Sequence, residues 1–350
     1  MTLEVIMKKI ICLLTLATIL ISCNKNEDGS KKEKLYVYSW AEFIPQIIYD
    51  KFEAETGIEI IEDIYSSNEE MFAKLKAGAT GYDVIMPSTD YLEILSREGM
   101  LLKLDKSKIS TFKNIDPIVL EKLQYFDPNN EMGVPYAMGA TGIIVNKKYV
   151  KNYNRDFSIY LDESLKGKMT LLDDMREVMT SALLTLGYKQ DTNNEKEIEE
   201  ASELVIKWKK NIIKFDAESF GKGFAMEEFY VVHGYSDNVY NELSLEERKN
   251  VEFIIPEKGG LSYIDSLAIT KDSKNLDSAY KFLEFIHKPE NYALICDTIG
   301  IPSINVPGRK LMKTKPVYEI EDLKNTEVLH DIKDTLPLHG KYWQKIMVSN

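Results

Sequence analysis

The chain has 350 residues, of which 44% are hydrophobic and 29% are charged, and its formal net charge at pH 7 is −12. This length and composition are typical of a globular protein with two lobes of ordinary size. The negative charge argues against a nucleic-acid partner, because phosphate binding requires clustered Lys and Arg. It suits a cationic ligand, although most acidic proteins owe their charge to solubility alone.

The N-terminus predicts a leader that is removed. Lys8 and Lys9 precede an almost entirely apolar run over 10–21, which is too short for a permanent membrane helix but fits the core of a signal peptide. The run ends in Leu-Ile-Ser-Cys, which resembles the lipobox of bacterial lipoproteins. We therefore expect residues 1–22 to be a lipoprotein signal peptide and Cys23 to be lipidated; an ordinary secretory signal with an incidental cysteine is the alternative.

The segment that follows is polar. Residues 23–33 lack apolar periodicity and predict a flexible tether. With Cys23 lipidated, Cys296 has no disulfide partner. Because Cys296 lies in an apolar helical context, we expect a small core residue rather than a nucleophile.

Strand-like and helix-like segments alternate in the first half of the chain. Strands are expected at 35–38, 58–64 and 82–86, each followed by a helix. Pro45 near the start of the first helix and Gly57 just past its end are the usual helix boundaries. The extended segment 133–146 is rich in small residues and predicts a strand that passes between two lobes, with a hinge near 139–142.

The second half repeats this alternation. A charged amphipathic helix over 195–212 is expected to bury Trp208 in the core. The other expected elements are strands at 169–172, 251–255 and 261–269 and helices at 173–186, 276–287 and 290–299. Alternating strands and helices predict a largely parallel α/β sheet with crossover helices.

Motifs for cofactor, metal or covalent chemistry are absent. The chain has no G-x-G-x-x-G, no phosphate-binding loop, no C-x-x-C, no H-E-x-x-H and no G-x-S-x-G, and its four histidines are scattered. One of them, His339, is expected at the surface. We therefore expect no cofactor and no metal, and the balance shifts from an enzyme towards a binding protein.

Four segments combine carboxylates or hydroxyls with aromatic rings at predicted strand ends or turns: 40–43, 88–91, 173–177 and 263–266. Each has a simpler explanation. Ser88 and Asp90 could cap the next helix, and Asp174 suits a helix N-terminus. Tyr263 and Asp265 could face solvent on one side of an edge strand.

Together the four segments form a coherent set. A linear polycation in a cleft needs carboxylates for its ammonium groups, because a buried unpaired charge is costly. Its methylene linkers and cationic ends favour aromatic faces, and a cation–π contact is worth roughly 0.5–2 kcal/mol per ring. Carboxylates spaced along a groove would then discriminate between ligands by length.

The chain resembles the bacterial spermidine/putrescine-binding proteins of ABC transporters. The resemblance runs in order from about Leu35 and is carried by "YSWAEFIP", "TGIEIIEDIYSSNEEMFAKLKAG", "YDVIMPSTDY", "VPYAMGATGIIVN", "LLDDMREV" and "GGLSYIDSLAI". It implies a two-lobed α/β periplasmic-binding-protein fold of type II, with two hinge-crossing strands and a ligand cleft between the lobes. By this analogy one lobe spans 34–138 and 264–310, and the other spans 143–258 and 315–350.

The resemblance also implies a function. It implies a monomeric extracytoplasmic receptor that binds putrescine or spermidine, performs no catalysis and delivers its ligand to a membrane ABC permease by cleft closure. Asp174 and Asp265 would pair with ammonium groups, Glu42 and Glu177 would take the remaining amines, and Trp40 would stack on the ligand. Ser88 matches a cleft hydroxyl of the family.

Several positions depart from the family pattern. Phe43 stands where a Tyr is usual, and Tyr235 and Tyr263 stand where Trp is common. Asp90 replaces a tyrosine and adds a carboxylate, and Leu329 lies where a Gln that binds a terminal amine is expected. The acidic residues persist while their surroundings change, which leaves the choice between a diamine and a longer polyamine open.

Three other functions remain. A receptor for another solute, such as an iron chelate or an anion, would place Arg, Lys or bare helix N-termini in the cleft, whereas the candidates here are mainly acidic. A carboxylate-pair hydrolase such as a glycosidase would need two carboxylates spaced across a sugar-sized cleft. The third alternative is a surface adhesin.

Overall fold

The strands form one mixed sheet. A computed structural model describes residues 32–329, 331–332 and 335–349, so the predicted signal peptide, Cys23 and nearly all of the predicted tether lie outside the described residues. The strand order is β2-β1-β3-β9-β4-β7-β5-β6, with β10 beside β9 and β8 beside β4. The strands of the described chain are β1 (Lys34–Trp40), β2 (Glu59–Tyr65), β3 (Val84–Ile85), β4 (Gly133–Asn146), β5 (Met169–Leu171), β6 (Ile212–Phe215), β7 (Val231–Tyr235), β8 (Val251–Ile254), β9 (Leu261–Ile269) and β10 (Glu327–Val328).

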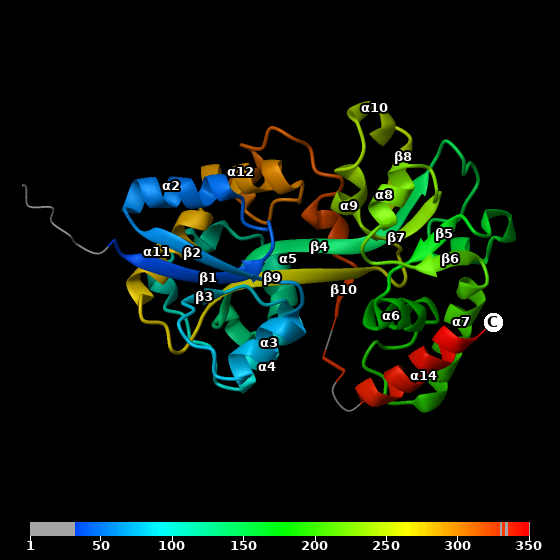
Figure 1. Cartoon of the computed structure of the whole chain (residues 1–350), viewed down its shortest axis with the longest axis horizontal. Helices are drawn as coiled ribbons and strands as arrows, with labels where there is room; N and C mark the ends of the chain where they lie inside the picture. Colours follow the sequence, from blue (N-terminus) through cyan, green and yellow to red (C-terminus); the bar gives the residue numbers. More distant parts are fainter. Residues whose placement is uncertain (1–31, 330, 333–334, 350) are drawn as a thin grey trace, which may run out of the picture. The chain divides into compact units, whose positions relative to one another are not determined.

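Helices cover both ends of this sheet. Figure 1 shows α2, α3, α4, α11 and α12 around β1–β3, and α6, α7 and α14 around β5–β7. The α-helices of the described chain are α2 (Gln46–Thr56), α3 (Asn68–Lys76), α4 (Thr89–Arg97), α5 (Pro117–Leu123), α6 (Met175–Thr185), α7 (Glu195–Lys209), α8 (Phe220–Ala225), α9 (Ser236–Tyr240), α10 (Leu245–Arg248), α11 (Leu276–Ile286), α12 (Pro289–Ile299), α13 (Val306–Arg309) and α14 (Leu336–Val348). Short 3-10 segments occur at Lys106–Lys108, Ser110–Asn114, Pro128–Asn130, Phe157–Leu161, Glu163–Leu165 and Ile320–Leu323.

The first strand–helix–strand unit forms for reasons visible in its sequence. Val37 of β1 is fully buried, and Ile48 and Phe52 of α2 pack into the same core at helical spacing. Gly57 ends α2 in the left-handed conformation, with φ of 75°, where a residue without Cβ is favoured. β1 then pairs in parallel with both β2 and β3, so the predicted crossover arrangement is confirmed here.

The middle of the sheet is antiparallel. β9 pairs antiparallel with β3 and β4, and β4 pairs antiparallel with β7, whereas β5–β6 and β5–β7 are parallel again. All 14 residues of β4 are buried. Its residues 133–140 pair with β9, and its residues 141–145 pair with β7. β4 therefore changes partners between Ala140 and Thr141, within the segment predicted as a hinge.

The buried hydrophobic side chains form two cores. The first core extends from Leu35 to Ala140 and from Ile264 to Val328, and the second from Ile143 to Ile254 with Tyr342 and Ile346. Residues 315–350 thus contribute to both cores, because Ile320, Leu323 and Val328 belong to the first and α14 to the second. The expected two-lobed α/β fold is confirmed, while the boundaries of the lobes stay a prediction.

Some local expectations were wrong. The helix expected over 195–212 ends at Lys209, because Ile212 already begins the unpredicted strand β6. His339 is fully buried rather than at the surface, since it lies on the inner face of α14. Cys296 and Trp208 are buried as expected. Among the residues that the structure describes, no helix has both the length and the apolarity needed to cross a membrane.

Candidate functional site

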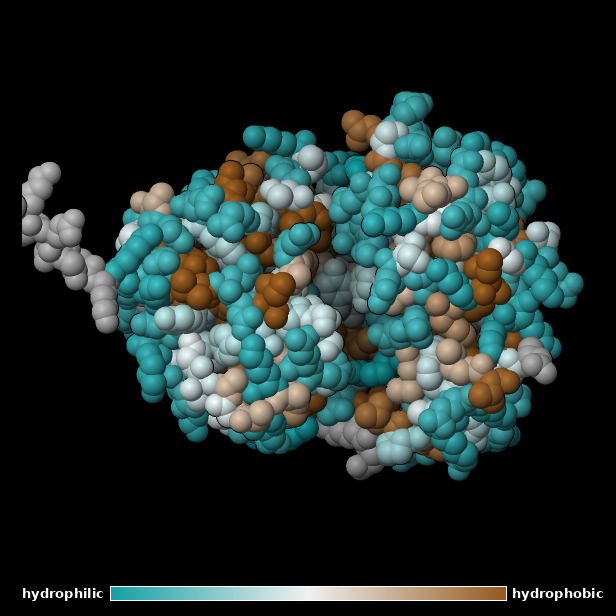
Figure 2. Space-filling model, in the orientation of Figure 1, coloured by the Kyte–Doolittle hydropathy of each residue, from teal (hydrophilic) through white to brown (hydrophobic). Residues whose placement is uncertain are grey.

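A pocket of about 790 Å³ is lined by residues from both cores. Figure 2 shows a hollow in the molecular surface near the middle of the view, which has the orientation of Figure 1. Nine of the ten residues expected to bind ligand line the pocket: Trp40, Phe43, Ser88, Asp90, Asp174, Glu177, Tyr235, Tyr263 and Asp265. Most of them lie at or just after the carboxyl ends of β1, β3, β5 and β7, the edge where open α/β sheets bind ligands.

Asp265 is one of two deeply buried carboxylates of the pocket and lies in the middle of β9. Its relative exposure is 5%, so it does not face solvent from an edge strand. Ser88 Oγ donates a hydrogen bond of 2.6 Å to Asp265 Oδ1. Burial raises the pKa of Asp265 to about 7; Asp90 adds to this, while the Ser88 hydroxyl and the Trp40 indole oppose it. A cationic ligand at Asp265 would therefore displace a proton near neutral pH.

Ser88 does not cap the helix that it precedes. It is the N-cap residue of α4, but its side chain makes no capping hydrogen bond and turns to Asp265 instead. Its backbone N–H donates to Asn68 Oδ1 at 3.2 Å, which ties the start of α4 to α3. Ser88, which the sequence suggested as a helix cap, therefore donates its hydroxyl to the buried carboxylate of Asp265 instead.

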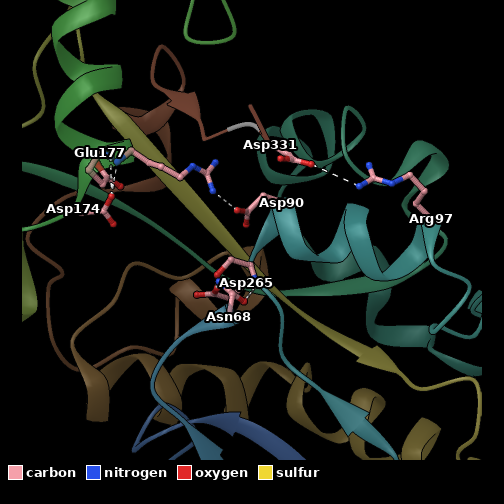
Figure 3. A network of polar contacts seen from close by, with 9 residues as sticks. Asn68, Asp90, Arg97, Asp174, Glu177, Asp265 and Asp331 are labelled. Atoms are coloured by element: carbon pink, nitrogen blue, oxygen red, sulfur yellow. Dashed lines mark hydrogen bonds and ion pairs between the residues drawn. The ribbon is translucent and has the colours of Figure 1, made fainter. Parts of the chain in front are cut away.

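The opposite side of the pocket is formed by the start of α6. Asp174 is the N-cap and accepts hydrogen bonds from the backbone N–H groups of Arg176 and Glu177, at 2.8 and 3.0 Å. The simpler explanation for Asp174 is therefore correct, and Asp174 lines the pocket as well. Figure 3 shows Asp174 and Glu177 together at one end of the polar network, with Asp265 beside Asn68.

Glu177 is the second buried acid, with a relative exposure of 5%. Thr141 of β4 donates a hydrogen bond of 2.9 Å to Glu177 Oε2. Burial raises the pKa of Glu177 to about 8, and the charge of Asp174 adds to this, while Thr141 and Arg176 oppose it. The raised pKa favours the protonated form of Glu177 near neutral pH, and a neighbouring cation would favour its ionised form.

An ion pair crosses the pocket. Arg176 Nη1 lies 2.6 Å from Asp90 Oδ2, and the two side chains are 22% and 11% exposed. Burial favours the neutral form of Arg176, but Asp90 outweighs it and raises the pKa of the guanidinium. The guanidinium therefore stays charged inside a pocket that is otherwise acidic.

Aromatic rings cover the remaining walls. The rings of Tyr235 and Tyr263 meet edge to face, with centroids 5.8 Å apart. Trp40 packs on Tyr65 at 4.6 Å, and its indole Nε1 is buried without a hydrogen-bond partner of normal geometry among the described residues. Burial raises the pKa of both Tyr235 and Tyr263, so both hydroxyls stay protonated.

Glu42 differs from the other nine candidates. It is exposed, has a φ of 57° in the turn between β1 and α2, and is not among the lining residues. Its expected role stays a prediction. The left-handed backbone at a residue with a side chain is unusual and is often found at functional sites.

Several polar residues of the pocket lie outside the four segments predicted from the sequence: Ser66, Ser67, Asn68, Glu69, Ser262 and Asp331. Glu69 lines the pocket from α3, and Asp331 lines it from the segment before α14. Asp331 Oδ2 lies 3.7 Å from Arg97, as Figure 3 shows. Glu69 lies in the first turn of α3, where a carboxylate also suits the helix N-terminus, and Asp331 lies outside the segments that carry the family resemblance. No cluster of three or more metal-ligating side chains occurs in the described parts of the chain.

Comparison with known proteins agrees with this architecture. Residues 48–319 match the family model described as bacterial extracellular solute-binding protein. The spermidine/putrescine-binding periplasmic protein of Escherichia coli is 35% identical over 321 residues, covering 89% of this chain and 91% of that protein. The putrescine-binding periplasmic protein SpuD of Pseudomonas aeruginosa is 36% identical over 293 residues, covering 79% of this chain and 80% of that protein.

Solved structures agree as well. The TpPotD lipoprotein of Treponema pallidum is 38% identical with a TM-score of 0.86, covering 90% of this chain and 99% of that one. The spermidine/putrescine substrate-binding protein PotD of Streptococcus pneumoniae is 28% identical with a TM-score of 0.81, covering 90% and 98%. These likenesses confirm a solute-binding receptor rather than an enzyme. The chain belongs to the bacterial extracellular solute-binding proteins, within the spermidine/putrescine-binding periplasmic protein family.

Proposed function

We propose that this protein captures a polyamine outside the cytoplasm and delivers it to an ABC importer. The observation that carries the proposal is the chemistry of the pocket. Among the residues that the structure describes, six carboxylates line it, with one guanidinium and five aromatic rings. The six are Glu69, Asp90, Asp174, Glu177, Asp265 and Asp331. An anion or an iron chelate would find too few donors there, whereas a linear polyamine supplies an ammonium group for each buried acid.

The two buried acids anchor the ligand in this proposal. Asp265 lies next to Ile264 of the first core and Glu177 next to Val178 of the second, and burial raises the pKa of both carboxyls. An ammonium group at each would displace those protons and replace them with charge-assisted hydrogen bonds. Asp174 adds negative charge beside Glu177.

The rings take the methylene chain. Trp40 and Phe43 line one side of the pocket, and Tyr235 and Tyr263 line it from β7 and β9. Their faces suit both the apolar linker and the adjacent ammonium groups.

Delivery completes the proposed function. A polyamine that contacts both cores favours the closed arrangement, which the permease would recognise. Lipidation at Cys23 would hold the receptor at the membrane surface, with 23–33 as its tether. The relative from Treponema pallidum, described as a lipoprotein, supports this anchor.

Calorimetric titration with putrescine, cadaverine, spermidine, free amino acids and a neutral sugar tests the proposal. Polyamines are expected to bind, and the other solutes are not. Asp265→Asn is expected to weaken polyamine binding at least about 30-fold, because truncating one partner of a buried charge pair costs about 2 kcal/mol or more. Asp277→Asn is the matched control, since Asp277 lies outside the pocket on α11 with 85% of its side chain exposed.

Two results would contradict the proposal. The first is binding of an amino acid or sugar in place of polyamines, which would support a receptor for another solute. The second is wild-type affinity in Asp265→Asn, which would show that the buried acid does not meet the ligand.

A further inference from the structure

The pocket contains a cation of its own. Arg176 is the one basic residue among the described residues that line it, against six carboxylates. A positive side chain in a cation-binding pocket repels the ligand unless a carboxylate neutralises it. Asp90 does so, at 2.6 Å.

The partners of this pair come from different cores. Asp90 lies in the first turn of α4, whose Leu92 is buried in the first core. Arg176 lies in the first turn of α6, whose Val178 is buried in the second core. The pair therefore spans the pocket, and both side chains are largely desolvated.

Asp90 is also a neighbour of the main ammonium site. Ser88, two residues before Asp90, donates a hydrogen bond to Asp265, and the charge of Asp90 raises the pKa of Asp265. Without Arg176, Asp90 and Asp265 would form an acidic pair suited to a second nearby cation. With Arg176 in place, that second cation is already supplied by the protein.

We propose that the Asp90–Arg176 pair sets the number of ligand cations that the pocket accepts and favours a diamine over a triamine. This inference rests on the proposed polyamine binding. The two ammonium groups of a diamine meet Asp265 at one end and Asp174 with Glu177 at the other. A third ammonium group has to compete for Asp90 with a tethered guanidinium, whose effective concentration is high. The pair thus makes Arg176 a specificity residue that acts through charge.

Affinities for putrescine and spermidine, measured by calorimetry, test this inference. In Arg176→Gln, Asp90 is free for a third ammonium group, so the ratio of affinities shifts towards spermidine by about tenfold or more. Arg176→Lys keeps the cation and is expected to keep the wild-type ratio. Lys196→Gln is the control, because it removes the same charge from an 81% exposed side chain of α7.

Asp90→Asn provides an independent arm. It removes the carboxylate that neutralises the guanidinium at 2.6 Å, so both affinities fall and spermidine, with more charge, loses more. The double variant Asp90→Asn/Arg176→Gln removes both charges and is expected to recover most of the putrescine affinity. Melting temperatures of the ligand-free variants verify that each one folds.

The outcomes separate this inference from the proposed function. An unchanged ratio in Arg176→Gln, or an equal loss of both affinities in Asp90→Asn, overturns the charge-counting role while polyamine binding stands. If the wild-type protein binds neither polyamine, the proposed function fails and the inference fails with it.

Discussion

Replacing Asp265 by Asn is expected to stabilise the ligand-free protein at alkaline pH while removing its function. The buried carboxyl of Asp265 has a pKa of about 7, against an ordinary value of 3.8. The native state therefore binds this proton more tightly than the unfolded chain does. By linkage, the contribution of Asp265 to stability is fully present below pH 4 and is lost as the pH rises towards 7.

The magnitude follows from the two pKa values. The full difference corresponds to about 4 kcal/mol once both states are ionised, of which about 2.5 kcal/mol develops between pH 5 and pH 8. The Asn side chain stays neutral, so the variant does not have the free-energy cost of ionising a buried carboxyl group. It weakens the hydrogen bond from Ser88, which costs about 1 kcal/mol at either pH. The free energy of unfolding of Asp265→Asn should thus exceed that of the wild-type protein by about 3 kcal/mol at pH 8.

Urea unfolding of the ligand-free protein at pH 5 and pH 8 measures this difference. Asp277→Asn is the control, because its exposed carboxylate has no burial penalty to lose and should show the same change with pH as the wild-type protein. The reasoning is refuted if Asp265→Asn is destabilised equally at both pH values. Such a result would mean that Asp265 is ionised at little cost in the native pocket.

Two further predictions concern the same pocket. Polyamine affinity should rise between pH 5.5 and pH 8, because Asp265 and Glu177 must lose protons to bind ammonium groups. Calorimetric titrations in buffers of different ionisation enthalpy should show the release of about one proton or more per ligand. Binding heats that do not depend on the buffer would contradict this prediction. Gly139→Ala should destabilise the protein by about 1–3 kcal/mol and weaken ligand binding, because a Cβ there overlaps the ring and hydroxyl of Tyr263. Gly340→Ala is its control in thermal unfolding, since a Cβ at Gly340 meets nothing within 4 Å and Ala favours the helix by up to about 1 kcal/mol.

The alternation of strands and helices in the sequence predicted most elements at the two ends of the sheet, because each of these elements buries its own apolar face. Ile48 and Phe52 recur at helical spacing, and the left-handed Gly57 ends their helix. The boundary after Trp208 was missed, because the apolar pair that follows Lys210 suits either a last helical turn or a new strand. Pairing with β5 decides for the strand, and that pairing is a tertiary contact.

In the candidate site, local sequence patterns do not predict which side chains contact each other across the fold. Ser88 and Asp174 both precede helices, so the sequence explains either of them as a cap. Asp174 is one, whereas Ser88 bonds to a carboxylate 177 residues away. The pairing of Asp90 with Arg176, 86 residues apart, is likewise a tertiary contact. Local spacing carries no trace of such contacts.

The two buried acids link the stability of the protein to the presence of a cationic ligand. Asp265 is held by β9 against the first core, and Glu177 by α6 against the second, with Thr141 of the strand that joins the cores donating to Glu177. Burial raises the pKa of both acids, so ionising them without a neighbouring cation costs stability as the pH rises. A diammonium ligand that contacts both would remove that cost at both ends at once. Because the two ends lie against different cores, the free energy gained would depend on the cores staying together, and ligand binding would thereby be coupled to closure.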